Sequence, residues 1–372
     1  MIDACEQAPA WIRGIAPYVP GKPAQELARE MGMDEAGIVK LASNENPLGP
    51  SPKALVAMRA ALEDITRYPD GNGFDLKQAL MARYGVGMGQ IVLGNGSNDV
   101  LELVARTFLA PGVSAVYSKH AFAVYPLSVQ SVGATHIETP AKNFGHDLAA
   151  MAGAIREDTR IVFIANPNNP TGTFLSGADL LGFLRAVPRR VIVVLDEAYT
   201  EYLAQEDRYD SIPWLAEFPN LVITRTFSKA YGLAGLRVGF ALAHPDVADL
   251  MNRVRQPFNV NSIAQAGAVA CLGDDEYLAR SRDINAQGMQ RMVEGVTALG
   301  LDHIPSRGNF FCVKVGAAPQ VYADLLRQGV IVRPVGAYAM PEWLRVSIGL
   351  SAENERFLSA LAAVVPASAR HR

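Results

Sequence analysis

The sequence predicts an α/β protein with a large domain built on a mostly parallel sheet and a smaller α+β domain after it. From about residue 90 onward, short apolar runs alternate with amphipathic stretches, and from about 260 to 300 the pattern becomes mostly helical. Alternating strands and helices of this kind form parallel sheets covered by helices. The length of 372 residues also exceeds one ordinary hydrophobic core and indicates about two domains.

The expected strands of the large sheet are short apolar segments separated by polar turns. Residues 191–195 form a continuous, mostly β-branched run, which is typical of a strand covered on both faces. Residues 98–109 read as a helix, and Ser176 with Asp179 three residues later predicts the start of another. The remaining strands are expected at 91–93, 114–117, 160–165, 221–224 and 238–242.

Changes in composition suggest where the domains divide. Residues 1–40 are rich in proline and glycine and predict an extended arm with a short helix that also joins the small domain. We expect the large domain over residues 41–257 and the small C-terminal domain over residues 258–372. Strands of the small domain are expected at 310–315, 330–332 and 344–348.

The composition argues against several classes of protein. A formal net charge of −3 offers no electrostatic attraction for nucleic acid or an anionic membrane. The six histidines are scattered and predict no metal site. No apolar run approaches the roughly 20 residues that span a bilayer. Residues 1–10 do not resemble a signal peptide, and the three distant cysteines suit reduced thiols. We therefore expect a cytoplasmic protein without nucleic-acid, membrane or metal partners.

Polar residues gather where the expected strands end, which is where parallel α/β sheets bind ligands. Residues 94–98, Gly-Asn-Gly-Ser-Asn, stand between a strand and a helix, and the free N–H groups of a helix start suit a phosphate. A plain glycine turn with Ser97 as the helix cap explains this segment equally well. Residues 166–172 place three asparagines between and beside two prolines, which favours amide donors in a crevice over an ordinary polar turn.

Two further strand ends carry charged groups. Asp196 ends the most apolar strand, where its carboxylate needs a cation; a protonated pyridine and an ordinary salt bridge are comparable explanations. Tyr199 follows and can hydrogen-bond a phenolic oxygen. Lys229 lies in a turn of glycine, serine and aromatic residues, where desolvation would free its amine for imine formation, although most lysines are solvated. With Arg237 as a phosphate clamp, these residues together offer every group that pyridoxal phosphate (PLP) needs.

The motifs, taken in order, resemble the class I and II aminotransferases of PLP fold type I, and among them the histidinol-phosphate aminotransferases. The resemblance covers nearly the whole chain and implies an α/β fold with a mostly parallel sheet of the seven-stranded type flanked by helices. It also implies a transferase that uses pyridoxal 5'-phosphate. The segments that carry the resemblance are 44–47, 68–70, 94–97, 166–172, 196–199 and 226–237.

In such an enzyme Lys229 would be the catalytic residue that forms the Schiff base, and Asp196 would pair with the pyridine nitrogen. Asn169 and Tyr199 would hydrogen-bond the ring oxygen. Phe122 falls where many members have a tyrosine stacked on the ring; phenylalanine can stack but supplies no hydroxyl. The residues that would hold the phosphate are Ser97, Asn98, Ser228 and Arg237.

The resemblance implies a homodimer, because Tyr68 would reach the phosphate of the neighbouring subunit's cofactor. At the substrate end, Arg345 matches the arginine that takes a carboxylate, and its guanidinium equally suits a phosphate. Arg333 and Tyr18 resemble the residues that bind the phosphate of histidinol phosphate, with packing and a surface ion pair as the alternative. Asn46 is expected to border the same pocket.

The implied reaction exchanges an amino group between L-histidinol phosphate or imidazole-acetol phosphate and 2-oxoglutarate or L-glutamate, in histidine biosynthesis. An aromatic amino-acid aminotransferase would differ only in the pocket. A lyase resembling threonine-phosphate decarboxylases shares the same frame. A PLP-responsive regulator is disfavoured, because its DNA-binding domain would need more than the first 40 residues.

Overall fold

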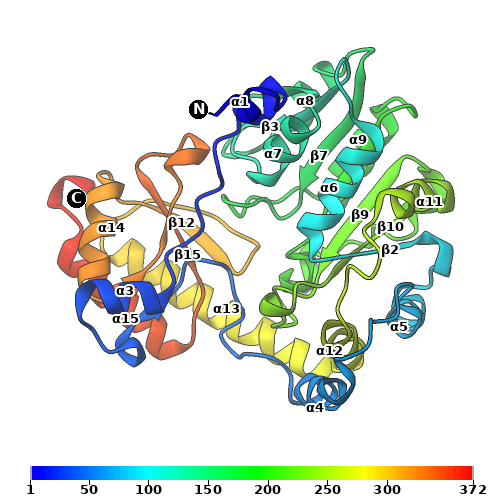
Figure 1. The fold of residues 1–372 in the computed structure, drawn as a ribbon. Helices are drawn as coiled ribbons and strands as arrows, with labels where there is room; N and C mark the ends of the chain where they lie inside the picture. The colour runs from blue at the N-terminus through cyan, green and yellow to red at the C-terminus, as the bar shows by residue number, and fades with distance from the viewer. Residues whose placement is uncertain (1, 371–372) are drawn as a thin grey trace.

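The computed structural model describes residues 2–370 as two domains lying side by side (Figure 1). The large domain contains a seven-stranded sheet in the order β2, β10, β9, β8, β7, β3, β4. Strand β10 (Gly239–Ala243) runs antiparallel to both neighbours, and the pairs from β9 to β4 are parallel, which confirms the mostly parallel sheet. The other strands are β2 (Ile91–Gly94), β3 (Ser114–Ser118), β4 (Thr135–Thr139), β7 (Thr159–Ala165), β8 (Ile192–Asp196) and β9 (Leu221–Thr226).

Helices cover both faces of this sheet. Side chains alternate along a strand, so Ile161 and Val162 pack into different hydrophobic clusters on opposite faces. One face is covered by α6 (Ser97–Phe108), α7 (Val124–Ser131) and α11 (Pro245–Val254). The other is covered by α5 (Phe74–Tyr84), α8 (Leu148–Gly153), α9 (Gly177–Ala186), α10 (Trp214–Glu217) and α12 (Ser262–Leu272), with α4 (Pro52–Ala61) beside α12. Ser176 caps α9 by accepting from the Asp179 amide, as predicted.

Strand β4 is the sheet strand that the sequence did not reveal. It forms one edge of the sheet, and three of its five residues are exposed. Because an edge strand borders solvent, it needs no apolar run and its sequence Thr-His-Ile-Glu-Thr gives no strand signal.

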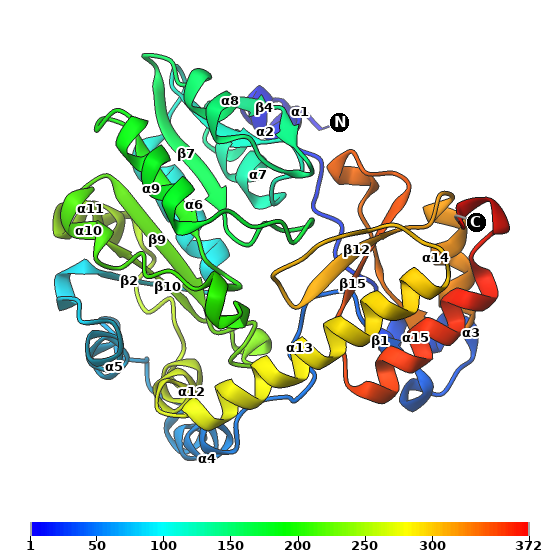
Figure 2. The same ribbon diagram turned by 180° about the vertical axis from the view of Figure 1, so that it is seen from behind.

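The small domain packs α14 (Ala318–Arg327) and α15 (Ser351–Val364) against a four-stranded sheet in the order β11, β12, β15, β14. Its strands are β11 (His303–Ile304), β12 (Phe310–Lys314), β15 (Trp343–Ser347) and β14 (Arg333–Pro334). The long helix α13 (Asp275–Ala298) runs across both domains (Figure 2). Cys271 and Leu278 belong to the large-domain core, whereas Met292 and Val296 belong to the small-domain core. The packing therefore favours a boundary inside α13, later than the one expected near residue 257.

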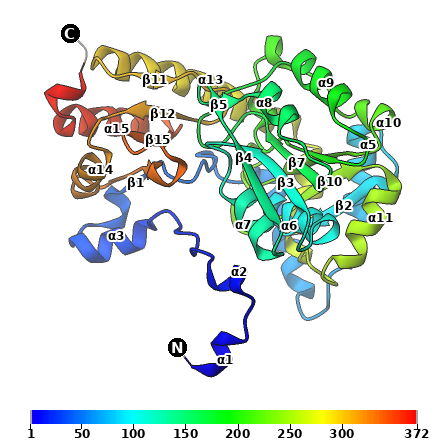
Figure 3. The same cartoon turned by 90° about the horizontal axis from the view of Figure 1, so that it is seen from above.

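The first 40 residues connect the two domains and contain more helix than the single short one expected. They form α1 (Asp3–Glu6), α2 (Ala10–Arg13) and α3 (Ala24–Met31), and Figure 3 shows α1 and α2 separated from α3. Leu27 of α3 packs on Ile331 of the small domain, while the Trp11 carbonyl accepts from Gln130 Nε2 of the large domain at 3.3 Å. Strand β1 (Val39–Lys40) then pairs with β13 (Val330–Ile331).

Candidate active site

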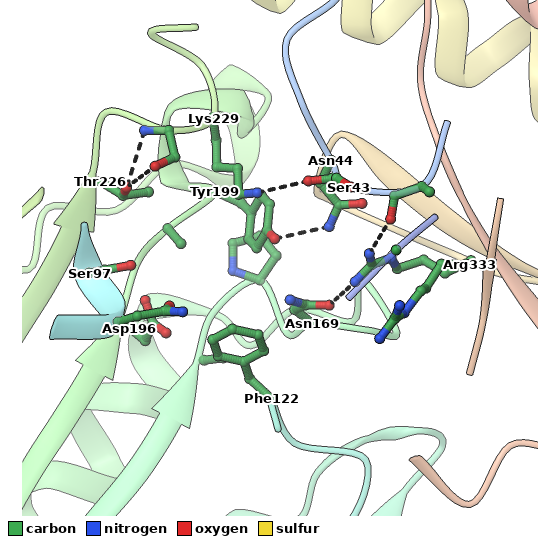
Figure 4. Close-up of a pocket in the computed structure, with 18 of the residues that line it drawn as sticks. Ser43, Asn44, Ser97, Phe122, Asn169, Asp196, Tyr199, Thr226, Lys229 and Arg333 are labelled. Carbon is green, nitrogen blue, oxygen red and sulfur yellow. Dashed lines mark hydrogen bonds between the residues drawn. The ribbon is translucent and has the colours of Figure 1, made fainter. Parts of the chain in front are cut away.

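A cavity of about 180 Å³ lies at the carboxyl ends of β7, β8 and β9, between the large domain, the arm and the small domain (Figure 4). All but two of the predicted site residues line it. Those that do are Tyr18, Ser97, Asn98, Phe122, Asn169, Asp196, Tyr199, Ser228, Lys229, Arg237, Arg333 and Arg345. Among residues 2–370 no cluster of acidic, histidine or cysteine side chains is arranged to hold a metal ion, and no helix has the length and apolarity to cross a membrane.

Lys229 follows β9 and brings its amine into this cavity. Its Nζ donates to the Ser43 carbonyl at 3.0 Å and lies 5.8 Å from the centre of the Tyr199 ring. Burial, together with the positive charge of Arg345, lowers the pKa of Lys229 to about 7. Since the amine is then partly uncharged near neutral pH, Lys229 is suited to attack a carbonyl and to accept a proton.

Asp196 ends β8 with its side chain 5% exposed. Its Oδ2 accepts from the Tyr125 hydroxyl at 2.9 Å and its Oδ1 accepts from the Thr224 hydroxyl at 3.1 Å. Burial raises the pKa of Asp196 to about 6, so this carboxylate gains from a cation in the cavity. The neighbouring Glu197, in contrast, forms an ion pair with an arginine, and its Oε2 lies 2.7 Å from Arg225 Nη2. Asp196 is thus left to face the cavity, where a pyridinium nitrogen fits it.

Polar donors gather beside Lys229 for an oxygen on a bound ring. The Tyr199 hydroxyl accepts from Asn44 Nδ2 at 3.0 Å, and burial raises the pKa of Tyr199 to about 12, so it keeps a proton to donate. The Asn169 Oδ1 accepts from Arg345 Nη1 at 2.5 Å. That bond orients the Asn169 amide and leaves its N–H groups as donors.

The end of the cavity lined by Ser97, Ser228 and Arg237 suits a phosphate. Helix α6 begins at Ser97, and the capping position is Gly96, whose φ of 80° brings the chain into the helix. Ser97 therefore does not act as the plain helix cap that the sequence allowed. Arg237 Nη1 donates to the Ser228 hydroxyl at 3.1 Å, so a guanidinium, two hydroxyls and the N–H groups of α6 converge.

The substrate end contains two arginines from the small domain. Arg333 Nη2 donates to the Val19 carbonyl at 2.7 Å, and its guanidinium lies 5.5 Å from the centre of the Tyr18 ring. Arg345 is buried; its Nη2 donates to the Ala42 carbonyl at 2.7 Å, while its Nε has no hydrogen-bond partner among the described residues. A buried, incompletely satisfied guanidinium is suited to an anionic substrate group.

Two predicted residues do not line the cavity. Asn46 is not among the residues that line the cavity, and its Nδ2 donates to the Ala230 carbonyl at 2.9 Å and to the Ser281 hydroxyl at 2.8 Å, so its place beside the substrate stays a prediction. Tyr68 lies elsewhere on the surface, 82% exposed and stacked on Phe258 with ring centres 4.8 Å apart.

Several lining residues were not predicted, namely Gly21, Ser43, Asn44, Thr226 and Tyr338. Asn44 and Thr226 lie inside motifs that the sequence analysis identified, so both could have been predicted as site residues. Tyr338 comes from a turn of the small domain with no polar pattern around it, and nothing local marks it.

Comparisons with known proteins agree with this geometry. The aminotransferase class I and II family matches residues 36–361. A histidinol-phosphate aminotransferase of Nitrosospira multiformis is 62% identical and aligns over 97% of this chain and 92% of its own length. Another, from Methylobacillus flagellatus, is 63% identical over 95% of this chain and 96% of its own.

A solved structure shows the same fold with a ligand. The histidinol-phosphate aminotransferase of Sinorhizobium meliloti, in complex with pyridoxal-5'-phosphate, superposes with a TM-score of 0.89 at 30% identity and covers 96% of this chain and 97% of its own. On the match over most of its length and on the fold, this chain belongs to the aminotransferase class I and II family, in the group of the histidinol-phosphate aminotransferases.

Proposed function

We propose that this chain binds PLP in the cavity and exchanges an amino group between L-histidinol phosphate and 2-oxoglutarate, as a cytoplasmic enzyme of histidine biosynthesis. One observation carries the proposal: the buried Lys229 amine shares a cavity with the Asp196 carboxylate and with the arginines at both ends. The names of the relatives, at about 60% identity over nearly their whole length, support the same substrate.

The residues of the cavity fit the cofactor group by group. When bound, PLP supplies an aldehyde that condenses with amines and a ring that takes up electrons. Asp196 would hold a proton on the ring nitrogen, and Asn169 and Tyr199 would donate to the ring oxygen. The Lys229 Nζ, when it is not bonded to the cofactor, would take the proton from the substrate Cα and hold it for return.

Arg333 and Arg345 would bind the anionic groups of the two substrates. Arg333, held beside the half-exposed Tyr18 ring, would bind the phosphate of histidinol phosphate. Arg345 is buried beside Asn169, close to the reacting amine, and would take the carboxylate of glutamate or a phosphate oxygen.

The test is one half-reaction followed by absorbance. PLP-loaded protein is mixed separately with L-histidinol phosphate and with L-phenylalanine, without a keto acid. We expect the visible absorbance of the bound cofactor to fall rapidly with histidinol phosphate and slowly with phenylalanine. The reverse order would make the chain an aromatic amino-acid aminotransferase, and carbon dioxide release from O-phosphothreonine would make it a lyase.

We also infer a homodimer, with Tyr68 reaching the cofactor phosphate of the second subunit. The support is a set of exposed apolar side chains in the same stretch of chain as Tyr68, together with Phe258, whose ring stacks on Tyr68. Its members include Val56, Leu62, Ile65, Phe74 and Phe258, exposed by 68%, 50%, 58%, 52% and 46%. Light scattering gives the mass in solution. A monomer that retains full activity would contradict the dimer and the role of Tyr68.

A further inference from the structure

Tyr125 is a buried tyrosine behind the cavity that none of the roles above includes. It lies in α7, one turn after Phe122, and its amide donates to the Phe122 carbonyl at 3.0 Å. Its ring stacks on Phe163 of β7 with centres 4.8 Å apart and planes 9° apart. These contacts fix the ring, so its hydroxyl has one direction in which to point, toward Asp196 Oδ2 at 2.9 Å.

The bond has a defined direction and a defined partner. Burial, and then the charge of Asp196, raise the pKa of Tyr125 well above its usual 10, so the hydroxyl keeps its hydrogen and donates it. Thr224 donates to the other carboxylate oxygen at 3.1 Å. Both oxygens of Asp196 are therefore engaged by neutral donors, and such hydrogen bonds favour the ionised form of a carboxylate.

We propose that Tyr125 is a positioning residue, which orients the Asp196 carboxylate and keeps it ionised so that the proton shared with the cofactor stays on the ring nitrogen. The segment from Phe122 to Tyr125 would then contribute twice: the Phe122 ring would stack on the cofactor, and the Tyr125 hydroxyl would hold Asp196, the counter-ion of the ring nitrogen. Phe122 and Asp196 lie on the same side of the cavity (Figure 4). The inference rests on the proposed binding of PLP.

The experiment compares Tyr125→Phe with Tyr117→Phe after loading with PLP labelled with nitrogen-15 in the ring. Tyr117 is a matched control, because it is also buried and bonded through its hydroxyl, to His136 at 2.6 Å, away from Asp196. In wild type and in Tyr117→Phe we expect the chemical shift of a protonated ring nitrogen. In Tyr125→Phe the shift should move toward that of the neutral ring, and turnover should fall about tenfold.

The possible failures are distinguishable. Wild-type protein that does not take up PLP would overturn the proposed function. A Tyr125→Phe protein with the wild-type nitrogen shift and turnover would overturn only the positioning role. Phenylalanine keeps the stacking on Phe163, and circular dichroism checks the fold. Should Tyr125→Phe not fold, Thr224→Val removes the other donor to the same carboxylate, and an unchanged nitrogen shift there overturns the inference.

Discussion

The two ends of the cavity are built in different ways. At the cofactor end, Asp196, Tyr199 and Lys229 lie at or just after the ends of neighbouring strands of one sheet. Asp196 and Tyr199 are buried, Lys229 is half-buried, and each is held by hydrogen bonds within the protein. At the substrate end, Tyr18 comes from the arm and Arg333 from the small domain, and Tyr18 is 52% exposed.

This difference suggests that the cofactor end carries out the reaction, whereas the substrate end selects the substrate. A rigid sheet can hold a cofactor to within fractions of an ångström, which the reaction needs. Segments from the arm and the small domain can shift relative to that sheet, so they can admit and release substrate. We therefore expect changes at the cofactor end to reduce turnover and changes at the substrate end to alter which substrate binds.

The largest effect is expected for Lys229→Ala. Without this amine nothing accepts the proton at the substrate Cα, and turnover should fall by about 1,000-fold or more. Steady-state rates measure the loss, and Lys142→Ala, an exposed lysine outside the cavity, is the control. Turnover near the wild-type rate in Lys229→Ala would remove the basis of the proposed mechanism.

The burial of Lys229 should also make the stability of the cofactor-free protein depend on pH. Its pKa is about 7 in the folded chain and 10.5 ordinarily, so between these values the unfolded chain binds more protons and stability rises with pH. Below pH of about 7 the cost of the buried charge is fully present. Urea unfolding at about pH 6 and about pH 9 should show Lys229→Met more stable than wild type, by a margin that shrinks at the higher pH. A margin independent of pH would contradict the lowered pKa.

Arg333→Gln sharpens the contrast at the substrate end. We expect KM for L-histidinol phosphate to rise about tenfold, because a charge-assisted bond to phosphate is lost, while KM for glutamate stays unchanged. Arg356→Gln is the control, since that exposed arginine of the small domain also donates to a carbonyl, of Gln328 at 2.9 Å. An equal rise for both substrates would assign Arg333 a purely structural role.

The smallest effect on catalysis is expected for Asn46→Ala. Its side chain links the Ala230 carbonyl to Ser281 of α13, so its loss should lower the free energy of unfolding by about 1–3 kcal/mol. KM should stay within about twofold of wild type, because the side chain does not reach the cavity. Denaturant unfolding and steady-state kinetics test this, and a large rise in KM would return Asn46 to the substrate pocket.

The sequence by itself determined the large sheet and the cofactor end. Strands buried on both faces must be apolar, so 160–165 and 191–195 stand out, and parallel α/β sheets bind ligands where such strands end. Asp196 and Lys229 were singled out near two strand ends, and the resemblance to the aminotransferases then implied their roles. The edge strand β4 was not predicted, because it borders solvent and carries no apolar run.

Only the tertiary structure decided how distant segments meet. Asn44 and Asn46 are two residues apart in one motif, yet Asn44 bonds Tyr199 in the cavity and Asn46 bonds Ala230 outside it. The φ of 54° at Asn44 turns the chain between them, and local sequence does not specify which side chain is directed inward. The hydrogen bond from Tyr125 to Asp196 could not be predicted from the sequence, because it joins residues 71 positions apart and depends on the packing of α7 against β7.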